Sequence, residues 1–109
     1  MGYDIDINYP DECGTTALMK AVANENIDII TLLLEHDANV NSVDCHGDTA
    51  LMEAARKGNI DCAKLLLSTG KIDNINKLNN YGTSALLHAR GYCEFVELLV
   101  HSGADVNCS

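Results

Sequence analysis

The cysteine and histidine side chains are the groups in this sequence whose types and spacing could do chemistry. Cys13 and His46 occupy the same position in two similar segments, and Cys45 lies next to His46. Thiolate and imidazole groups are preferred ligands of Zn²⁺, at about 2.0–2.3 Å from the ion. If the two segments form neighbouring helical units, their helices pack about 8–10 Å apart, and these groups start too far apart to share one ion. We therefore expect no metal site and no cofactor.

The thiols themselves are a second source of chemistry. The sequence has five cysteines, which is an odd number, and no Cys-x-x-Cys motif. This pattern favours reduced thiols in an intracellular protein, cytoplasmic or nuclear, over a disulfide framework. Cys62 replaces an apolar helix residue and is expected in the core. Cys13 and Cys45 are expected as exposed loop thiols, which can join two chains through a disulfide during storage.

The histidines do not form a catalytic motif. Nucleophilic catalysis requires a serine or cysteine beside a histidine base, together with a third group that orients the base. The histidines are His36, His46, His88 and His101. His36 and His101 occupy matching positions after leucine-rich segments, where a cation interacts favourably with a helix C-terminus. The sequence therefore predicts no catalytic residues and a protein that is not an enzyme.

The composition is that of an acidic folded domain. The 109 residues are 47% hydrophobic with few aromatic side chains, which suits a core of Leu, Ile, Val and Ala. The 16 acidic and 7 basic residues give a formal net charge of −9. An acidic surface repels phosphate groups, so we expect neither nucleic acid nor a membrane as a partner. It favours a protein partner with a neutral or basic surface.

Internal repetition organises the chain. Residues 14–21, Gly-Thr-Thr-Ala-Leu-Met-Lys-Ala, return 33 positions later as Gly-Asp-Thr-Ala-Leu-Met-Glu-Ala and again at 82–89 as Gly-Thr-Ser-Ala-Leu-Leu-His-Ala. A block rich in leucine and isoleucine follows each copy, and a third block ends each unit. These later blocks are residues 26–34, 59–67 and 94–100, and residues 38–41, 73–76 and 104–107. A period near 33 residues indicates stacked supersecondary units.

Each block has a physical meaning. Thr16, Thr49 and Ser84 precede apolar residues at helical spacing, where a side-chain oxygen caps a helix by accepting an orphan backbone N–H. Gly58 supplies the left-handed residue that often ends a helix, and Asn59 caps the helix that follows. The stretches rich in Asn, Asp and Gly are typical of tight turns. The sequence therefore predicts two helices and a turn in each unit.

This pattern resembles the ankyrin repeat, whose motif is Gly, Thr-Pro-Leu-His, Ala-Ala, Gly, Leu-Leu-Leu and Gly-Ala-Asp-Val-Asn. The resemblance covers roughly residues 11–109 and recurs three times. It implies an all-α solenoid of stacked helix-turn-helix units, with short β-hairpin loops that project from one edge. The Pro and His positions of the motif are occupied here by Ala17, Ala50 and Ala85, and by Met19, Met52 and Leu87. We expect apolar packing in place of the hydrogen bonds of the motif's histidine.

The whole chain, residues 1–109, is expected to form one ankyrin-repeat domain. The expected parts are a partial leading hairpin at 1–10, repeat 1 at 11–43, repeat 2 with a two-residue insertion at 44–78, and repeat 3 with a shortened first helix at 79–109. Neither end shows the polar capping repeat that covers the terminal core of a solenoid. We therefore expect either a place in a longer array or self-association through the uncapped ends.

The resemblance also implies a binding surface, because ankyrin repeats bind partners through hairpin tips and the inward face of the first helices. The matching tip positions are Glu12, Cys13, Thr15, Cys45, His46, Asp48, Asn80, Tyr81 and Thr83. The matching helix positions are Lys20, Ala23, Asn24, Glu53, Arg56, Lys57, His88 and Arg90. Tyr81 is the strongest candidate, because tyrosine offers a large rigid contact with a polar end. The alternative for each position is a solvated surface side chain.

Two asparagines have a second interpretation. Asn41 and Asn107 each end a Val-Asn pair eight residues after a leucine, Leu33 or Leu99. In the ankyrin family such asparagines are similar to sites of asparaginyl hydroxylation. The alternative is that each asparagine braces the turn in which it lies.

The function predicted from these observations is a non-catalytic protein-interaction module, a scaffold or adaptor. The alternative is a structural stacking or oligomerisation segment of a longer ankyrin array, within a multidomain or effector protein. An enzyme is the third class. The histidines stand in no catalytic motif, and the sequence has no Gly-rich phosphate-binding loop.

Overall fold

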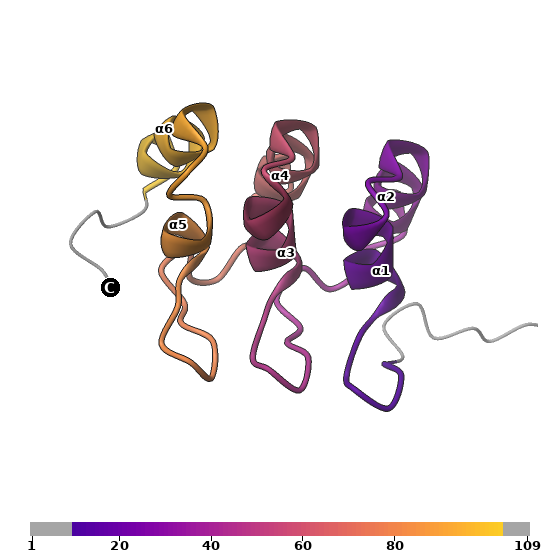
Figure 1. The fold of residues 1–109 in the computed structure, drawn as a ribbon. Coiled ribbons are helices and arrows are strands. Elements are labelled where there is room, and N and C mark those ends of the chain that lie inside the picture. Colours follow the sequence, from indigo (N-terminus) through magenta and orange to yellow (C-terminus); the bar gives the residue numbers. More distant parts are fainter. Residues whose placement is uncertain (1–9, 104–109) are drawn as a thin grey trace, which may run out of the picture.

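The computed structural model describes residues 10–103, which form six helices joined by loops and turns (Figure 1). The helices are α1 (Ala17–Ala23), α2 (Ile27–Glu35), α3 (Ala50–Lys57), α4 (Ile60–Ser68), α5 (Ala85–His88) and α6 (Cys93–His101). They form three pairs that stand side by side in a row, and the loops before α1, α3 and α5 extend to one side. Within the described range, no helix has the length and apolar character needed to cross a bilayer.

Consecutive pairs touch through equivalent helices. α1 packs on α3 and α3 on α5, while α2 packs on α4 and α4 on α6. The two helices of each pair also pack on each other. Because every pair buries its apolar side against its neighbour, the core runs along the row as in other repeat proteins. The predicted all-α solenoid of helix-turn-helix units is confirmed.

Local side-chain bonds explain where the helices begin. The side-chain oxygens of Thr16, Thr49 and Ser84 accept the N–H of the residue three positions on, at 3.2–3.3 Å. Asn59 caps α4 in the same way, and Gly58 ends α3 with a φ of 68°. These are the caps that the sequence predicts, since each depends on a bond between residues close in the chain.

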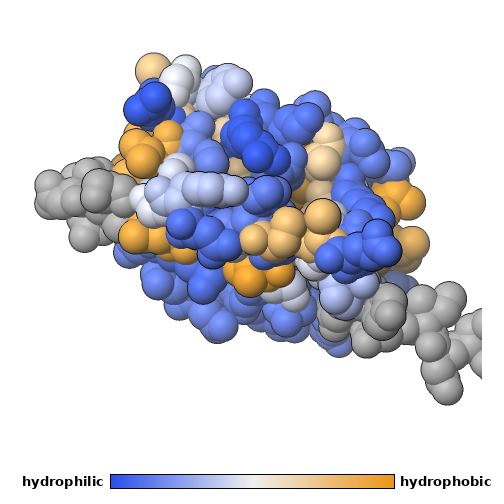
Figure 2. Space-filling view, turned by 60° about the horizontal axis from the view of Figure 1, so that its bottom comes forward, coloured by the Kyte–Doolittle hydropathy of each residue, from blue (hydrophilic) through white to orange (hydrophobic). Residues whose placement is uncertain are grey.

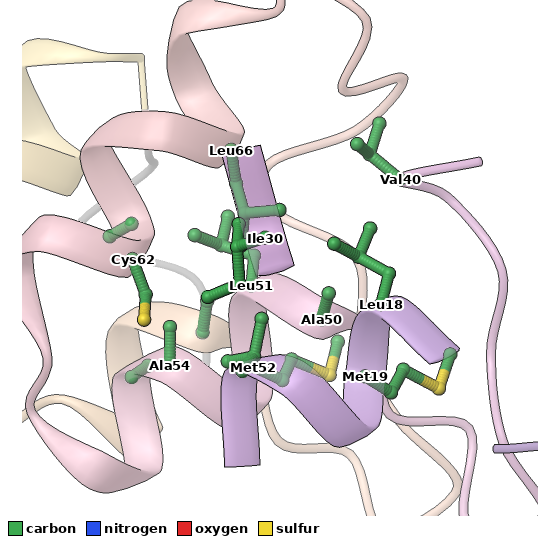
Figure 3. Close-up of a cluster of buried hydrophobic side chains, with 14 of the residues drawn as sticks. Leu18, Met19, Ile30, Val40, Ala50, Leu51, Met52, Ala54, Cys62 and Leu66 are labelled. Atoms are coloured by element: carbon green, nitrogen blue, oxygen red, sulfur yellow. The ribbon is translucent and has the colours of Figure 1, made fainter. Parts of the chain in front are cut away.

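The core lies between the helix pairs and consists mainly of small and branched side chains (Figure 3). Leu18 and Leu51 hold the same place in α1 and α3, and both are buried. Met19 and Met52 are buried as well. The expected apolar packing at these two positions is therefore confirmed, and methionine suits it because its flexible thioether fills irregular gaps.

The second helices contribute a matching set of leucines. Leu66 and Leu99 are fully buried, and Leu33 is partly buried against the same core. Cys62 in α4 is also fully buried, as predicted from its place among apolar helix residues. Equivalent residues of successive units therefore occupy equivalent interior positions along one stack.

The loops before α1, α3 and α5 double back as hairpins, although no residue of the range 10–103 is assigned to a strand. α5 has four residues, against seven in α1 and eight in α3. It lies where Ala89-Arg90-Gly91 stands in place of the five residues from Ala54 to Gly58. The boundaries expected for the leading hairpin and the three repeats stay predictions.

Candidate functional site

One side chain holds the backbone of each hairpin loop, and the three side chains occupy equivalent positions. They are Asp11, Asp44 and Asn79, in chain order. Asp44 Oδ1 accepts the backbone N–H groups of His46 and Asp48, at 2.9 and 3.0 Å. The same pair of bonds recurs at Asp11 and at Asn79. We call the loops tip 1 (residues 11–15), tip 2 (44–48) and tip 3 (79–83). Asp and Asn are the residues that hold such turns, because their short side chains reach the backbone N–H two residues on.

The prediction of site residues missed these three. Their recurrence at intervals of 33 and 35 positions was visible in the sequence. The three residues precede the glycine that begins the clearest repeated block, so they lie outside that block. Their bonds hold the backbone of each tip, which carries the predicted contact residues.

Neighbouring tips are bonded to each other through their backbones. The Cys45 N–H donates to the carbonyl of Cys13 at 2.6 Å, and the Asn80 N–H donates to the carbonyl of His46 at 2.9 Å. Gly47 permits the second approach, because a Cβ there would lie 2.8 Å from the Asn80 nitrogen. The tips therefore form one continuous edge, and they bring the predicted contacts Cys13, Cys45, His46 and Asn80 together.

The side chains of His46 on tip 2 and Tyr81 on tip 3 contact each other. The Tyr81 hydroxyl on tip 3 lies 3.0 Å from Nδ1 of His46 on tip 2, and the ring centroids are 6.0 Å apart. Tyr81 is 71% exposed. The two predicted contact residues therefore support each other while the tyrosine ring faces solvent.

A hollow of about 220 Å³ lies beside the tips, between α1 and α3. Its predicted contact residues are Thr15, Lys20, Ala23, Asp48, Glu53 and Arg56. Arg56 pairs with Glu53 and lies 3.9 Å from Asp48 Oδ2, and Lys20 pairs with Asp11 at 3.3 Å. The hollow is therefore lined by charges of both signs, and those of Lys20, Glu53 and Arg56 are already paired.

Some predicted positions take structural roles. Asp48 is buried, and its Oδ1 accepts a bond from Asn79 Nδ2 at 2.8 Å. His88 Nε2 lies 3.8 Å from the same oxygen. Thr83 is half-buried in tip 3, where its backbone N–H donates to Asn79. The remaining predicted positions are exposed and lie outside the hollow, and they are Glu12, Asn24, Lys57 and Arg90.

The face on the side of the tips is mostly hydrophilic, with small separate hydrophobic patches (Figure 2). The tips contribute one large exposed apolar side chain, that of Tyr81. Aromatic side chains are enriched in protein interfaces, and the rim of such interfaces is polar.

Cys13 affects the pKa of the Cys45 thiol on the neighbouring tip. A side-chain hydrogen bond with Cys13 is the main reason that the pKa of Cys45 is raised, followed by desolvation and the charges of Cys13 and Asp44. We expected groups of neighbouring units to start too far apart to share one metal ion, and the approach of these two thiols alone does not test this. Helix spacing does not set the distance between loops whose backbones are bonded to each other.

Two further observations concern the buried Cys62 and the capacity to bind a metal ion. Burial is the main cause that raises the pKa of Cys62 to about 11, and the charges of Glu25 and Asp61 add to it. Cys62 is thus a packing residue rather than a nucleophile. Among residues 10–103, no three His, Cys, Asp or Glu side chains group in a way that could hold a metal ion.

Asn41 joins two units through its side chain. Its Nδ2 donates to the carbonyl of Lys71 at 2.8 Å, and its Oδ1 accepts the N–H of Asp73 at 2.9 Å. Both ends of the amide are therefore engaged with the neighbouring unit rather than with the turn in which Asn41 lies. Hydroxylation of Asn41 stays a prediction, and Asn107 lies outside the described residues.

The paired helices, stacked in one row with bonded tips along one edge, define a helical repeat solenoid. The family described as "Ankyrin repeats (3 copies)" matches residues 1–77, and the one described as "Ankyrin repeat" matches residues 81–109. The chain therefore belongs to the ankyrin repeat family, as its sequence motif indicated. The comparison with curated proteins found no match. Ankyrin repeats generally serve as protein-interaction modules and are typically non-catalytic.

Proposed function

We propose that this chain is a non-catalytic scaffold or adaptor module, which binds a protein through tips 1–3 and the adjoining face of α1, α3 and α5. The observation that carries the proposal is Tyr81, which is 71% exposed and held by His46 on the neighbouring tip. Tyrosine is among the residues that contribute most to protein interfaces. A side chain positioned before binding loses less conformational entropy when the complex forms.

The partner's chemistry follows from the charges around this edge. Carboxylates of Asp44, Asp48 and Glu53 line the hollow, beside Lys20 and Arg56. The chain as a whole has a formal net charge of −9. These charges favour a neutral or basic protein surface over nucleic acid or an anionic membrane, and salt weakens the attraction. The odd number of cysteines supports an intracellular location, cytoplasmic or nuclear.

The proposal is tested by identifying a partner and then removing the proposed contacts. Affinity capture with mass spectrometry identifies the partner, and calorimetry compares its affinity for the wild type and for a variant with Tyr81→Ala, His46→Ala and Arg56→Ala. We expect the triple variant to bind roughly a hundredfold more weakly, because hot-spot truncation costs about 2 kcal/mol or more. Lys64→Ala, at an exposed position on α4, is the control. Unchanged affinity in the triple variant would show that the surface lies elsewhere.

Exposed apolar side chains at the two ends of the described row favour a second candidate, a stacking or oligomerisation segment. Ile29 and Leu32 of α2 are 42% and 50% exposed, and Val100 of α6 is 39% exposed. End-to-end association would cover them, as neighbouring repeats do in a longer solenoid. Light scattering separates the two candidates, since a concentration-independent monomer contradicts the second. If an assembly forms, Leu32→Glu should dissolve it.

A further inference from the structure

Cys13 and Cys45 are the two cysteines at which tip 1 and tip 2 meet through their backbones. Both thiols are exposed, and the Cys45 N–H donates to the Cys13 carbonyl at 2.6 Å. The backbones are so near that a Cβ added at Gly14 would lie 3.1 Å from the Cα of Asp44. A backbone bond between two residues brings their α-carbons into the range of about 4.4–6.8 Å that a disulfide spans.

We propose that Cys13 and Cys45 are a dithiol modification site, which a low-molecular-weight disulfide converts into an intramolecular disulfide between tips 1 and 2. The proposal concerns the chemistry of this pair and does not depend on a binding partner. The equivalent contact between tips 2 and 3 pairs His46 with Asn80, so it cannot form such a bond.

The reaction proceeds by two thiol–disulfide exchanges. The thiolate of one cysteine attacks a sulfur of the small disulfide, forms a mixed disulfide and releases one small thiol. The second cysteine loses its proton and attacks the protein-bound sulfur of the mixed disulfide, which closes the bond and releases the second small thiol. Two protein thiols lose two protons and two electrons, and one small disulfide is reduced to two thiols. In a reducing compartment this bond is transient, as redox-sensing disulfides are.

Closure has a measurable structural consequence. The bond ties residues 32 positions apart in the sequence and so restricts the unfolded chain. A loop of this size corresponds to a rise of roughly 15–20 °C in Tm for a domain of about 100 residues. The bond also fixes tip 1 against tip 2 at the edge where their backbones already meet.

The test uses the full chain with oxidised glutathione as the oxidant, followed by mass spectrometry without reductant. We expect a monomer that has lost two hydrogens, a cross-linked peptide that joins Cys13 to Cys45, and the rise in Tm. Cys13→Ala and Cys45→Ala should each abolish the cross-link and leave a stable glutathione adduct on the remaining cysteine. Cys93→Ser, which changes another exposed cysteine, should retain both the cross-link and the Tm shift.

Two results would overturn the proposal. One is a wild-type chain that accumulates stable glutathione adducts on Cys13 and Cys45, as the single variants do. The other is a cross-link found only between chains, in disulfide-linked dimers. Circular dichroism of each variant before oxidation checks that the fold is intact, so that a missing cross-link reports on the chemistry of the pair.

Discussion

Asn79 donates a hydrogen bond from Nδ2 to Oδ1 of Asp48 at 2.8 Å, and both side chains are buried. The bond joins tip 3 to tip 2. Asn79 stands where tips 1 and 2 have Asp11 and Asp44, and its own oxygen still holds the tip 3 backbone. Asparagine supplies an acceptor to its own tip and a donor to the neighbouring carboxylate, whereas aspartate would bring two carboxylates together.

Asn79→Asp should therefore destabilise the protein at neutral pH. The substitution keeps the oxygen that holds tip 3, removes the bond to Asp48 and adds charge repulsion. We expect a loss of about 1–3 kcal/mol in the free energy of unfolding, measured by urea denaturation, because a buried charged acceptor loses its partner. The loss should shrink as the pH falls, because repulsion between the two carboxylates favours the binding of a proton by one of them.

Asp44→Asn is the matched control for this substitution. Asp44 accepts two backbone N–H groups in tip 2, and an asparagine oxygen accepts them equally well. We expect a change within about 0.5 kcal/mol, as for most surface substitutions. If the two variants lose the same stability, the bond between Asn79 and Asp48 contributes nothing specific.

Two glycines with the same φ should respond differently to substitution by alanine. Gly58 and Gly70 both have a φ of 68°, but an added Cβ would lie 2.6 Å from the Tyr92 ring at Gly58 and would meet nothing within 4 Å at Gly70. Gly70→Ala should cost about 1 kcal/mol through backbone strain alone. Gly58→Ala should cost roughly 1 kcal/mol more, because the ring must move. Urea denaturation measures both, and equal losses would contradict the close packing of Tyr92 on Gly58.

Interactions between residues close together in the chain could be predicted from the sequence, whereas contacts between residues far apart in the chain could not. The caps at Thr16 and Thr49 could be predicted because each bonds to a residue three positions away. The buried Met19 and Met52 could be predicted because they recur on the apolar side of equivalent helices. Such features repeat from unit to unit, so a single chain displays them several times.

Contacts between tips could not be predicted in the same way. The bond from Cys45 to Cys13 depends on the distance between tip 1 and tip 2, and the spacing of the helices does not determine that distance. The bond from Asn79 to Asp48 depends on a difference between repeats, since only tip 3 among the described tips has an amide at this position. The candidate site is built from such contacts, so the sequence predicts neither their pairing nor the part that Asn79 takes in them.

Acid should remove stability that Asp11 supplies to tip 1. The pKa of Asp11 is lowered from its ordinary value of 3.8, mainly by the hydrogen bond from the Thr15 backbone, and also by Cys13 and Lys20. A carboxyl group with a lowered pKa in the folded state contributes stability above its unfolded pKa. That stability is lost as the pH falls through the folded pKa. We expect the wild type to lose more stability than Asp11→Asn between about pH 5 and pH 2, measured by urea denaturation. Parallel losses in the two proteins would contradict the lowered pKa.

Removing Cys13 should make Cys45 more reactive at neutral pH. The hydrogen bond with Cys13 is the main cause that raises the pKa of Cys45, so Cys13→Ala should lower that pKa and increase the fraction of thiolate. We expect alkylation of Cys45 by iodoacetamide at pH 7 to become several-fold faster, since the gain in thiolate outweighs its lower nucleophilicity. The difference should vanish at a pH where Cys45 is ionised in both proteins.

The other cysteines serve as internal standards for this rate. Cys93 is exposed and should react equally in both proteins, whereas Cys62, with a pKa of about 11 and no exposed surface, should stay unlabelled until the chain unfolds. Mass spectrometry of the digested protein gives the rate at each site. An unchanged rate at Cys45 would mean that the two thiols are not in contact in solution. The two thiols would then also be too far apart to form the intramolecular disulfide.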